Sequence, residues 1–308
     1  MFKNSGLLTF YAETSLHMGA GTSVSYVDLP IQRERHTEFP LIQATGIKGV
    51  IREFAKRNWQ DEIKVEVIFG PEDGEKFASC ITFTDARILL FPVRSVSGIF
   101  AWITCPFILK RFKRDLESAG MTLSNFSIPE PSDENKIIIA NNTLLKVQGT
   151  SQVMLEEFVF EIENRKSAQG IAESIKNYLP ETGAFVDLIN TLPSRLAIVS
   201  NNIFRDFVKM AVEINTRIKI NQTTGVVEEH ALFSEELIPS ESIFYSLVFF
   251  NDPYSKTNSV KDAKNVEKEI IKLFNGFPLL QLGGDETTGR GLVRVKFTPA
   301  QTNQGGAQ

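Results

Sequence analysis

The stretch "DARILLFPVRSVSGIFAWITCP" (residues 85–106) joins a run of strand-forming residues to the start of a helix. With the residues just before it, the run over 80–93 is rich in β-branched and aromatic side chains, which predicts a strand. The segment 105–120 predicts a helix, because Pro106 stands near its first turn and Gly120 at its end. The centre of the chain therefore combines strand and helix.

The same patterns continue outward toward both ends of the chain. A first strand is expected over residues 7–17, and helical periodicity begins near Thr45. Toward the C-terminus, "SIFYSLVFF" (242–250) predicts an apolar strand and "AKNVEKEIIKLFNG" (263–276) an amphipathic helix, while 216–233 resembles a β-hairpin. This order of strand, helix and strand at both ends fits an α+β fold, a ferredoxin-like sheet with large insertions.

Composition and charge limit the classes of function. The chain has 308 residues, 42% of them hydrophobic and 23% charged, which suits a globular protein with a sizeable core. A net charge of -4 argues against a generally basic nucleic-acid-binding domain, although local basic clusters can hold phosphate on an acidic protein. No signal peptide or run of ~18 apolar residues is visible, so we expect a cytoplasmic protein without a membrane segment. One basic cluster consists of Lys110, Arg111, Lys113 and Arg114.

The sequence contains no recognisable metal-binding motif. Cys80 and Cys105 lack CxxC spacing and are expected to be buried free thiols. His17, His36 and His230 are scattered, and no HExxH or EF-hand spacing is present. A metal, if used, would have to be held by isolated side chains.

A loop of more than twenty residues follows the first expected strand, and loops of that length are usually functional or disordered. It contains "VDLPIQRE" (27–34), and together with His17 it gathers Asp28, Arg33 and Glu34 in a glycine-containing segment. An aspartate in a loop more often forms a turn or a cap than it catalyses, so both readings stand for Asp28. Arg33 either meets phosphate or pairs with Glu34.

Two further patterns could hold phosphate. The segment "GGDETTGRG" (283–291), called the glycine loop below, lets backbone N–H groups approach an anion, although it is neither a P-loop nor a Rossmann turn and could be a plain hairpin loop. Lys48, Arg52 and Lys56 recur every four residues on one helical stripe, which suits a phosphate backbone but also a solvated face. The glycine-loop residues that could contact RNA are Gly283, Gly284, Gly289, Arg290 and Gly291.

Several of these segments together resemble a known family. "HMGAG", "VDLPIQRE", "GIKGVIRE", "FGPEDGE", the stretch over 85–106 and "LGGDETTGRG" are similar to the RAMP superfamily of CRISPR proteins. More narrowly, they resemble the backbone subunits of the type III-B Cmr effector complexes. The resemblance covers most of residues 7–297, and the stretch over 85–106 is highly specific.

The resemblance implies a fold and an assembly. We expect one RAMP domain over 1–297, with an RRM-like palm, large insertions and a projecting β-hairpin thumb at about 216–236; the polar segment 298–308 is expected to be a disordered tail. Copies of such proteins stack, with other Cmr subunits, into a helical filament along guide RNA. Target RNA paired to the guide is cut at regular intervals, and the cutting requires a divalent metal, Mg²⁺ or Mn²⁺.

The resemblance also assigns roles to individual residues. Asp28 matches the family's cleavage aspartate and would be the metal ligand. His17 matches a histidine near the same site, where it could be a general base or acid or could make a structural hydrogen bond. Lys48 matches a lysine that contacts guide phosphates, and Arg52 lies one turn further along. The glycine loop matches a loop placed against the guide backbone.

The thumb departs from the family pattern at one position. Where the family typically has "ALWYEEYLP", this chain has "ALFSEELIP" (231–239), with Ser234 in place of an aromatic residue. Glu228, Glu229 and Glu235 are candidates for a secondary acidic role. The main hypothesis is a metal-dependent endoribonuclease subunit, and the alternative is a non-catalytic filament protein that only positions target RNA. A stand-alone nuclease that processes guide precursors is disfavoured by the long thumb-like insertion.

Overall fold

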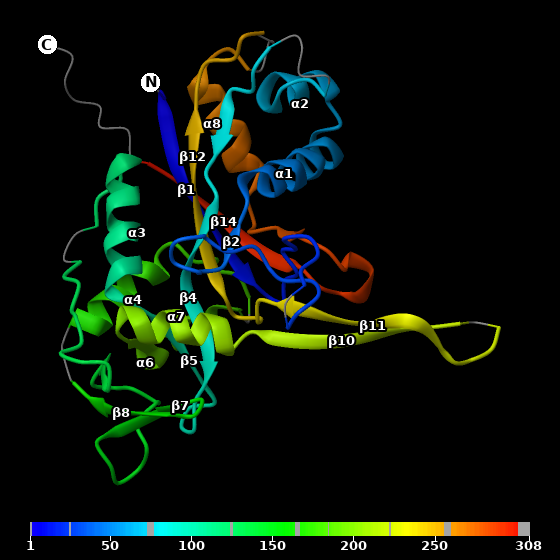
Figure 1. The fold of residues 1–308 in the computed structure, drawn as a ribbon. Coiled ribbons are helices and arrows are strands. Elements are labelled where there is room, and N and C mark those ends of the chain that lie inside the picture. Colours follow the sequence, from blue (N-terminus) through cyan, green and yellow to red (C-terminus); the bar gives the residue numbers. More distant parts are fainter. Residues whose placement is uncertain are drawn as a thin grey trace, which may run out of the picture.

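The computed structural model describes residues 2–24, 26–72, 77–123, 126–163, 167–183, 185–221, 223–255 and 260–300. A mixed sheet runs through the molecule, helices lie on its two sides, and a long hairpin projects from it (Figure 1). The strands are β1 (Asn4–Ala12), β2 (Leu41–Ile42), β3 (Ile81–Phe83), β4 (Ala86–Arg94), β5 (Phe100–Thr104), β6 (Lys136–Ile139), β7 (Gln152–Leu155), β8 (Phe158–Ile162), β9 (Leu196–Ile198), β10 (Glu213–Ile220), β11 (Val227–Leu237), β12 (Ile243–Phe250), β13 (Leu279–Gln281) and β14 (Leu292–Pro299). The helices are α1 (Ala44–Trp59), α2 (Glu62–Phe69), α3 (Pro106–Ser118), α4 (Ser167–Lys176), α5 (Phe185–Asn190), α6 (Leu192–Arg195), α7 (Asn201–Met210), α8 (Ala263–Leu273) and the 3-10 helix η1 (Glu286–Thr288).

Four strands form the centre of the sheet in the order β14, β1, β12, β4, each antiparallel to its neighbours. The chain passes from β1 through α1 to β4, and from β12 through α8 to β14. The sheet then continues from β4 through β5, β9, β6 and β8 to β7. The mixed α and β class expected from the sequence is therefore present.

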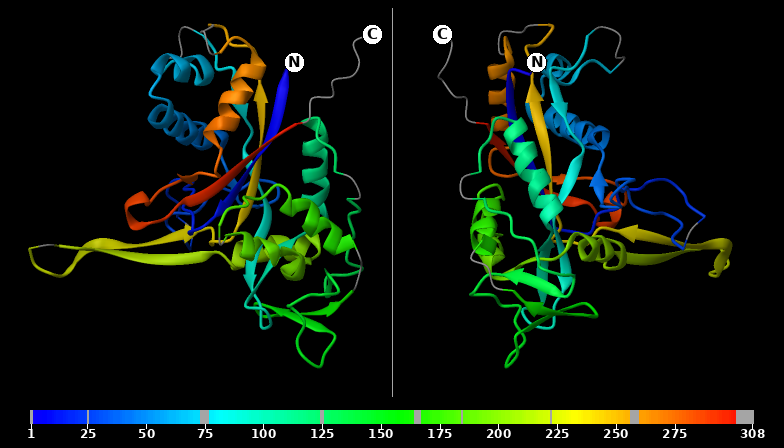
Figure 2. Two further views of the ribbon diagram at one scale, coloured as in Figure 1. Left: turned by 180° about the vertical axis from the view of Figure 1, so that it is seen from behind. Right: turned by 60° about the vertical axis from the view of Figure 1, so that its left-hand side comes forward.

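Helices cover both faces of these central strands. In opposite views, α1, α2 and α8 lie on one side of the sheet and α3 lies on the other (Figures 1 and 2). Consequently β1 is buried on both faces of the sheet from Gly6 to Ala12, and β12 is almost wholly buried. Strands covered on both faces need near-continuous apolar sequence, which explains why 242–250 shows no polar alternation.

The helix predicted from near Thr45 is α1, and its buried side chains are Ile47, Ile51 and Ala55. The strand predicted over 80–93 is divided into β3 and β4. Asp85 lies at the division, and its Oδ1 accepts a 2.8 Å hydrogen bond from the first backbone N–H of α1, that of Ala44. The break in the strand thus supplies the cap that the start of α1 otherwise lacks.

The hairpin predicted over 216–233, and as a thumb at about 216–236, is formed by β10 and β11 and is longer than expected at both ends. It extends away from the sheet in every view (Figures 1 and 2). Among the hairpin side chains that the structure describes, the buried ones lie at its base, at Glu235, Glu236 and Leu237. The remainder exposes aliphatic side chains, namely those of Ile214, Ile218, Ile220, Val227 and Leu232, called the aliphatic residues of the hairpin below.

The C-terminal strand extends further than the sequence predicted. β14 ends at Pro299, which pairs with Gly6 of β1, so the expected tail does not begin at 298. Residues 301–308 lie outside the described residues. In the part of the chain that the structure describes, none of the helices has the length and apolar character needed to cross a membrane.

Candidate functional site

The long loop after β1 is held against the base of the hairpin. Leu16 exchanges two backbone hydrogen bonds of 2.9 Å with Ile238, just beyond β11. Further along the loop, the N–H of Leu29 donates to the carbonyl of Ser234, and the N–H of Glu236 donates to the carbonyl of Leu29, both at 3.0 Å. Residues on both sides of the loop's tip are thereby fixed to one strand.

Asp28 is exposed at this junction and is bound by a single residue of β11. Its Oδ2 accepts hydrogen bonds from the Ser234 N–H at 2.7 Å and from the Ser234 hydroxyl at 2.8 Å. The bonds from the Ser234 backbone and then from its side chain hold the pKa of Asp28 below its ordinary value. The carboxyl group is therefore ionised at neutral pH, and Oδ1 makes no hydrogen bond to the described residues.

His17 meets the same strand two residues further on. Its Nδ1 lies 2.9 Å from the backbone carbonyl of Glu236 and 3.4 Å from Oε1 of Glu235. Both neighbours are acceptors, so Nδ1 carries the proton and Nε2 of a neutral imidazole is left as an acceptor. β11 therefore holds His17 and Asp28 at the same end of the hairpin.

An acidic pair, buried Glu235 and half-buried Asp285, lies beside His17. Arg217 spans Glu235 and Asp285, with Nη2 3.1 Å from Oε2 of Glu235 and Nη1 2.6 Å from Oδ1 of Asp285. Burial, followed by the neighbouring Asp285 carboxyl, raises the pKa of Glu235. Burial acts in the same direction on Asp285, but its interactions, led by the hydrogen bond from Arg217, outweigh burial and lower the pKa of Asp285. Arg217 of β10 thus ties the hairpin to the glycine loop through Asp285.

Arg33 and Glu34 are not paired with each other, and Arg33 is already occupied. Arg33 Nη2 lies 2.5 Å from Oε1 of Glu236, whose Oε2 accepts from the Ile31 N–H at 2.9 Å. Glu34 is bound through both carboxylate oxygens by buried Arg111, at 2.8 and 2.9 Å. The predicted pairing of Arg33 with Glu34 is therefore wrong: Arg33 pairs with buried Glu236 of β11, and Arg111 is buried against Glu34 and is not part of a surface phosphate site.

The glycine loop contacts the segment after β1 that carries His17. The N–H of Gly284 donates to the carbonyl of His17 at 2.9 Å, and the N–H of Gly291 donates to the carbonyl of Ser15 at 3.0 Å. A Cβ on Gly283 would lie 2.3 Å from the His17 oxygen, whereas a Cβ on Gly289 would meet nothing within 4 Å. At least one glycine is thus required by close backbone packing. Arg290 is half-buried, with Nη1 3.9 Å from a carboxylate oxygen of Glu213.

The predicted stripe of cations lies on α1, on the side that faces α2. Burial, and then the nearby Arg52, lowers the pKa of Lys48, which forms no ion pair with the described residues. Arg52 donates to the carbonyl of Gly70 at 2.5 Å, with Nη2 3.7 Å from Glu72. Lys56 is more exposed and lies 3.9 Å from the same carboxylate. Of the three cations, Arg52 therefore also binds the backbone at the C-terminal end of α2.

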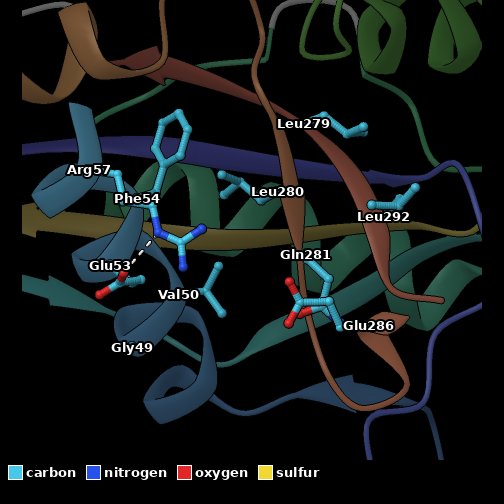
Figure 3. A pocket seen from close by; sticks show the side chains of 10 residues that line it. All are labelled: Gly49, Val50, Glu53, Phe54, Arg57, Leu279, Leu280, Gln281, Glu286 and Leu292. Atoms are coloured by element: carbon cyan, nitrogen blue, oxygen red, sulfur yellow. Dashed lines mark hydrogen bonds and ion pairs between the residues drawn. The ribbon is translucent and has the colours of Figure 1, made fainter. Parts of the chain in front are cut away.

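A cavity of about 420 Å³ separates α1 from the glycine loop (Figure 3). Gly49 and Val50 of α1 line one wall, and Gln281 and Glu286 line the other. Phe54 and three leucines supply an apolar floor. The helix of the predicted cation stripe and the glycine loop therefore border one hollow.

The described residues hold no group of three or more His, Cys, Asp or Glu side chains that could bind a metal ion. At Asp28, Oδ1 is the carboxylate oxygen left to bind a cation, because Oδ2 is bound by Ser234. Mg²⁺ and Mn²⁺ can take most of their ligands from water and phosphate. The residues present therefore suit a cation coordinated mainly by nucleic-acid phosphate and water, and they do not suit a cation coordinated by protein side chains alone.

Some site residues were not found from the sequence. Ser234 was noted only as a departure from a pattern, and its contact with Asp28 joins residues 206 positions apart. Arg217 and Asp285 carried no local signal, since charged residues in a hairpin and in a loop are ordinary. Glu235 was named and is part of the site. The side chains of Glu228 and Glu229 lie outside the described residues.

Comparison with known proteins gives the class to which this fold and site belong. The family model of the RAMP superfamily matches residues 9–294, and the chain belongs to that superfamily. Within it, the chain is 41% identical over 303 residues to the CRISPR system Cmr endoribonuclease Cmr4 of Pyrococcus furiosus, covering 97% of each protein. A crystal structure of oligomeric Cmr4 from Pyrococcus furiosus matches with a TM-score of 0.71 and 35% identity, over 96% of this chain and 98% of that one. A chain of the type III-B Cmr-beta complex bound to cognate target RNA has the same fold, with a TM-score of 0.72 at 24% identity over 96% and 98% of the two chains.

Proposed function

We propose that this chain is the backbone subunit of a type III-B CRISPR effector complex and that it cleaves target RNA paired to a guide RNA. The observation that carries the proposal is the ionised, exposed Asp28 at the base of a projecting hairpin, in a chain 41% identical to an endoribonuclease. Several copies would polymerise along the guide RNA with other Cmr subunits, in the cytoplasm. The oligomeric Cmr4 crystal structure of the relative supports the self-association.

Within this proposal, the four central strands form a ferredoxin-like, RRM-like palm. The order β14, β1, β12, β4 places the first and third strands in the middle, as a strand, helix, strand repeat requires. The β10–β11 hairpin is then the thumb, and displacing one base of the guide–target duplex beside it would cost a few kcal/mol. Contacts along the RNA backbone would offset that cost.

Lys48 and the glycine loop are the surfaces proposed to hold the guide. Lys48 is free of ion pairs with the described residues, and the glycine loop borders the same hollow as its helix. Lys56 and Arg290 would add charge at the two margins, while Arg52 would act mainly by holding α2 in place. Such contacts track phosphates and read no sequence, which suits a protein whose specificity is delegated to base pairing.

The chemistry proposed at Asp28 is transesterification by the RNA itself. The 2′-oxygen attacks the adjacent phosphorus, the bond from phosphorus to the 5′-oxygen breaks, and the products are a cyclic phosphate and a 5′-hydroxyl. Asp28 accepts a hydrogen bond from the 2′-hydroxyl and orients it, Nε2 of His17 takes the proton of that hydroxyl, and the departing 5′-oxygen takes up a proton from solvent water. A Mg²⁺ or Mn²⁺ ion bound at Oδ1 of Asp28 would supply positive charge to the phosphate.

The test is target cleavage by an assembled complex that carries Asp28→Asn, which keeps the size of the side chain and removes its charge. We expect a single-turnover rate lowered by about a hundredfold or more, with target binding unchanged. Glu38→Gln is the matched control, since Glu38 lies in the same loop and pairs with Lys209 at 3.0 Å. Cleavage at the wild-type rate by the Asp28→Asn complex would favour the alternative, a filament subunit that only positions target RNA.

A further inference from the structure

Ser234 and Asp28 hold each other through three hydrogen bonds. The N–H and hydroxyl of Ser234 both donate to Oδ2 of Asp28, at 2.7 and 2.8 Å, and the N–H of Asp28 donates to the Ser234 hydroxyl oxygen at 3.1 Å. The hydroxyl thus donates and accepts at once, which fixes the rotation of its O–H as well as the carboxylate. Between Leu232 and Ile238, Ser234 carries the one hydroxyl in the sequence.

We infer that Ser234 is a positioning residue for cleavage: it binds one oxygen of Asp28 so that the other, Oδ1, is presented to RNA at the base of the hairpin. The inference rests on the proposed function of Asp28. It adds to that function a residue on β11 that sets the direction of the carboxylate. Because β11 belongs to the hairpin, the carboxylate is then fixed relative to the element proposed to displace the target base.

Other charged groups of the packed elements have different partners. On β11, Glu235 faces His17 and Arg217, and Glu236 faces Arg33. Hydrogen bonds from Ser234 are the leading causes of the lowered pKa of Asp28, and no charged side chain is among them. Among the described residues, Ser234, and no salt bridge, is therefore the group that fixes the Asp28 carboxylate.

Two variants of equal size distinguish the effect of the hydroxyl from the effect of side-chain volume at position 234. Ser234→Thr keeps the γ-oxygen, Ser234→Val has the same shape without it, and both favour a strand. Ser234→Ala removes the hydroxyl without adding bulk. In each variant the backbone N–H at position 234 remains, so the loop keeps its main-chain bonds to β11.

The first measurement is the titration of the Asp28 side-chain carboxyl in the full-length chain, followed by carbon-detected NMR. The wild-type and Ser234→Thr chains are expected to titrate below the ordinary pKa of aspartate, and Ser234→Ala and Ser234→Val closer to it. The second is single-turnover cleavage by complexes assembled with guide RNA. We expect Ser234→Ala and Ser234→Val to be about three- to tenfold slower with unchanged target affinity, and Ser234→Thr to restore the rate.

The outcomes separate this inference from the proposed function. Equal rates and equal Asp28 titrations for Ser234→Thr and Ser234→Val would overturn the role of the hydroxyl, even if Asp28→Asn is inactive. Wild-type cleavage by Asp28→Asn would instead overturn the proposed function, whatever the Ser234 variants do. A loss of cleavage in Ser234→Thr equal to that in Ser234→Val would assign the effect to the shape of the strand and would also refute the inference.

Discussion

Gly283 and Gly289 of the glycine loop offer a direct test of the packing described above. Both residues have positive φ, 86° and 78°, so an alanine at either position adopts an unfavourable backbone conformation. They differ in their surroundings. A Cβ at position 283 would lie 2.3 Å from the carbonyl oxygen of His17, whereas a Cβ at 289 would meet nothing within 4 Å.

The two alanine variants should therefore differ in stability. The left-handed conformation costs a non-glycine residue about 1–2 kcal/mol, partly offset by about 0.4–1 kcal/mol from a less flexible unfolded chain, so Gly289→Ala should destabilise by about 1 kcal/mol. Gly283→Ala must in addition push the loop away from His17. That movement would break the 2.9 Å bond from the Gly284 N–H, and with the displaced packing it brings the expected loss to about 3 kcal/mol.

Urea unfolding of the two variants and the wild-type chain, followed by circular dichroism, measures this difference. The midpoint should fall clearly further for Gly283→Ala than for Gly289→Ala, with a similar dependence on urea. Equal midpoints for the two variants would refute the reasoning, because they would mean that the glycine loop does not pack against the backbone of His17 as the structure shows. We also expect Gly283→Ala to slow target cleavage, since His17 would move with its carbonyl.

Two further predictions concern buried titratable groups. Burial raises the pKa of Glu241 to about 7. The folded state therefore holds this proton more tightly than the unfolded state does. The resulting contribution to the free energy of unfolding is fully present below the pKa of glutamate in the unfolded chain and is lost as pH rises through about 7. Glu241→Gln should therefore stabilise the chain by about 2 kcal/mol at pH 8 and have no effect near pH 4, and equal gains in unfolding free energy at both pH values would contradict the assignment. Burial likewise raises the pKa of the Cys80 thiol to about 11 and that of Cys105 to about 12. We expect neither thiol to react with iodoacetamide at pH 8 until the chain is unfolded, as mass spectrometry would show.

The elements with strong local patterns were predictable from the sequence. The start of α1 near Thr45, the helix over 105–120 and the strands beside the glycine loop follow from periodicity and from proline and glycine at their ends. Where the sequence reading failed, a distant residue decided the local structure. Asp85 interrupts an apolar run because its carboxylate caps α1, 41 positions away, and no pattern within the run records that requirement.

The site was only partly predictable for the same reason. Residue type and position marked Asp28 and His17, but a local reading left the partner of Arg33 open between phosphate and Glu34. The actual partner, Glu236, lies 203 positions away and is selected by the way the loop packs on β11. Contacts of this kind depend on strand register, which a single sequence read by itself does not specify. The same holds for the bond between Ser234 and Asp28.

The exposed hairpin has a practical consequence for handling the protein. Apart from its base, β10–β11 is a two-stranded ribbon with free edges and the aliphatic residues of the hairpin on its surface. Ribbons of this kind are marginal in water, and bare edges invite pairing with other chains. The isolated subunit should therefore tend to associate irregularly and to be nicked by proteases in the hairpin. Co-expression with RNA and neighbouring subunits would shield the ribbon and is the better route to homogeneous material.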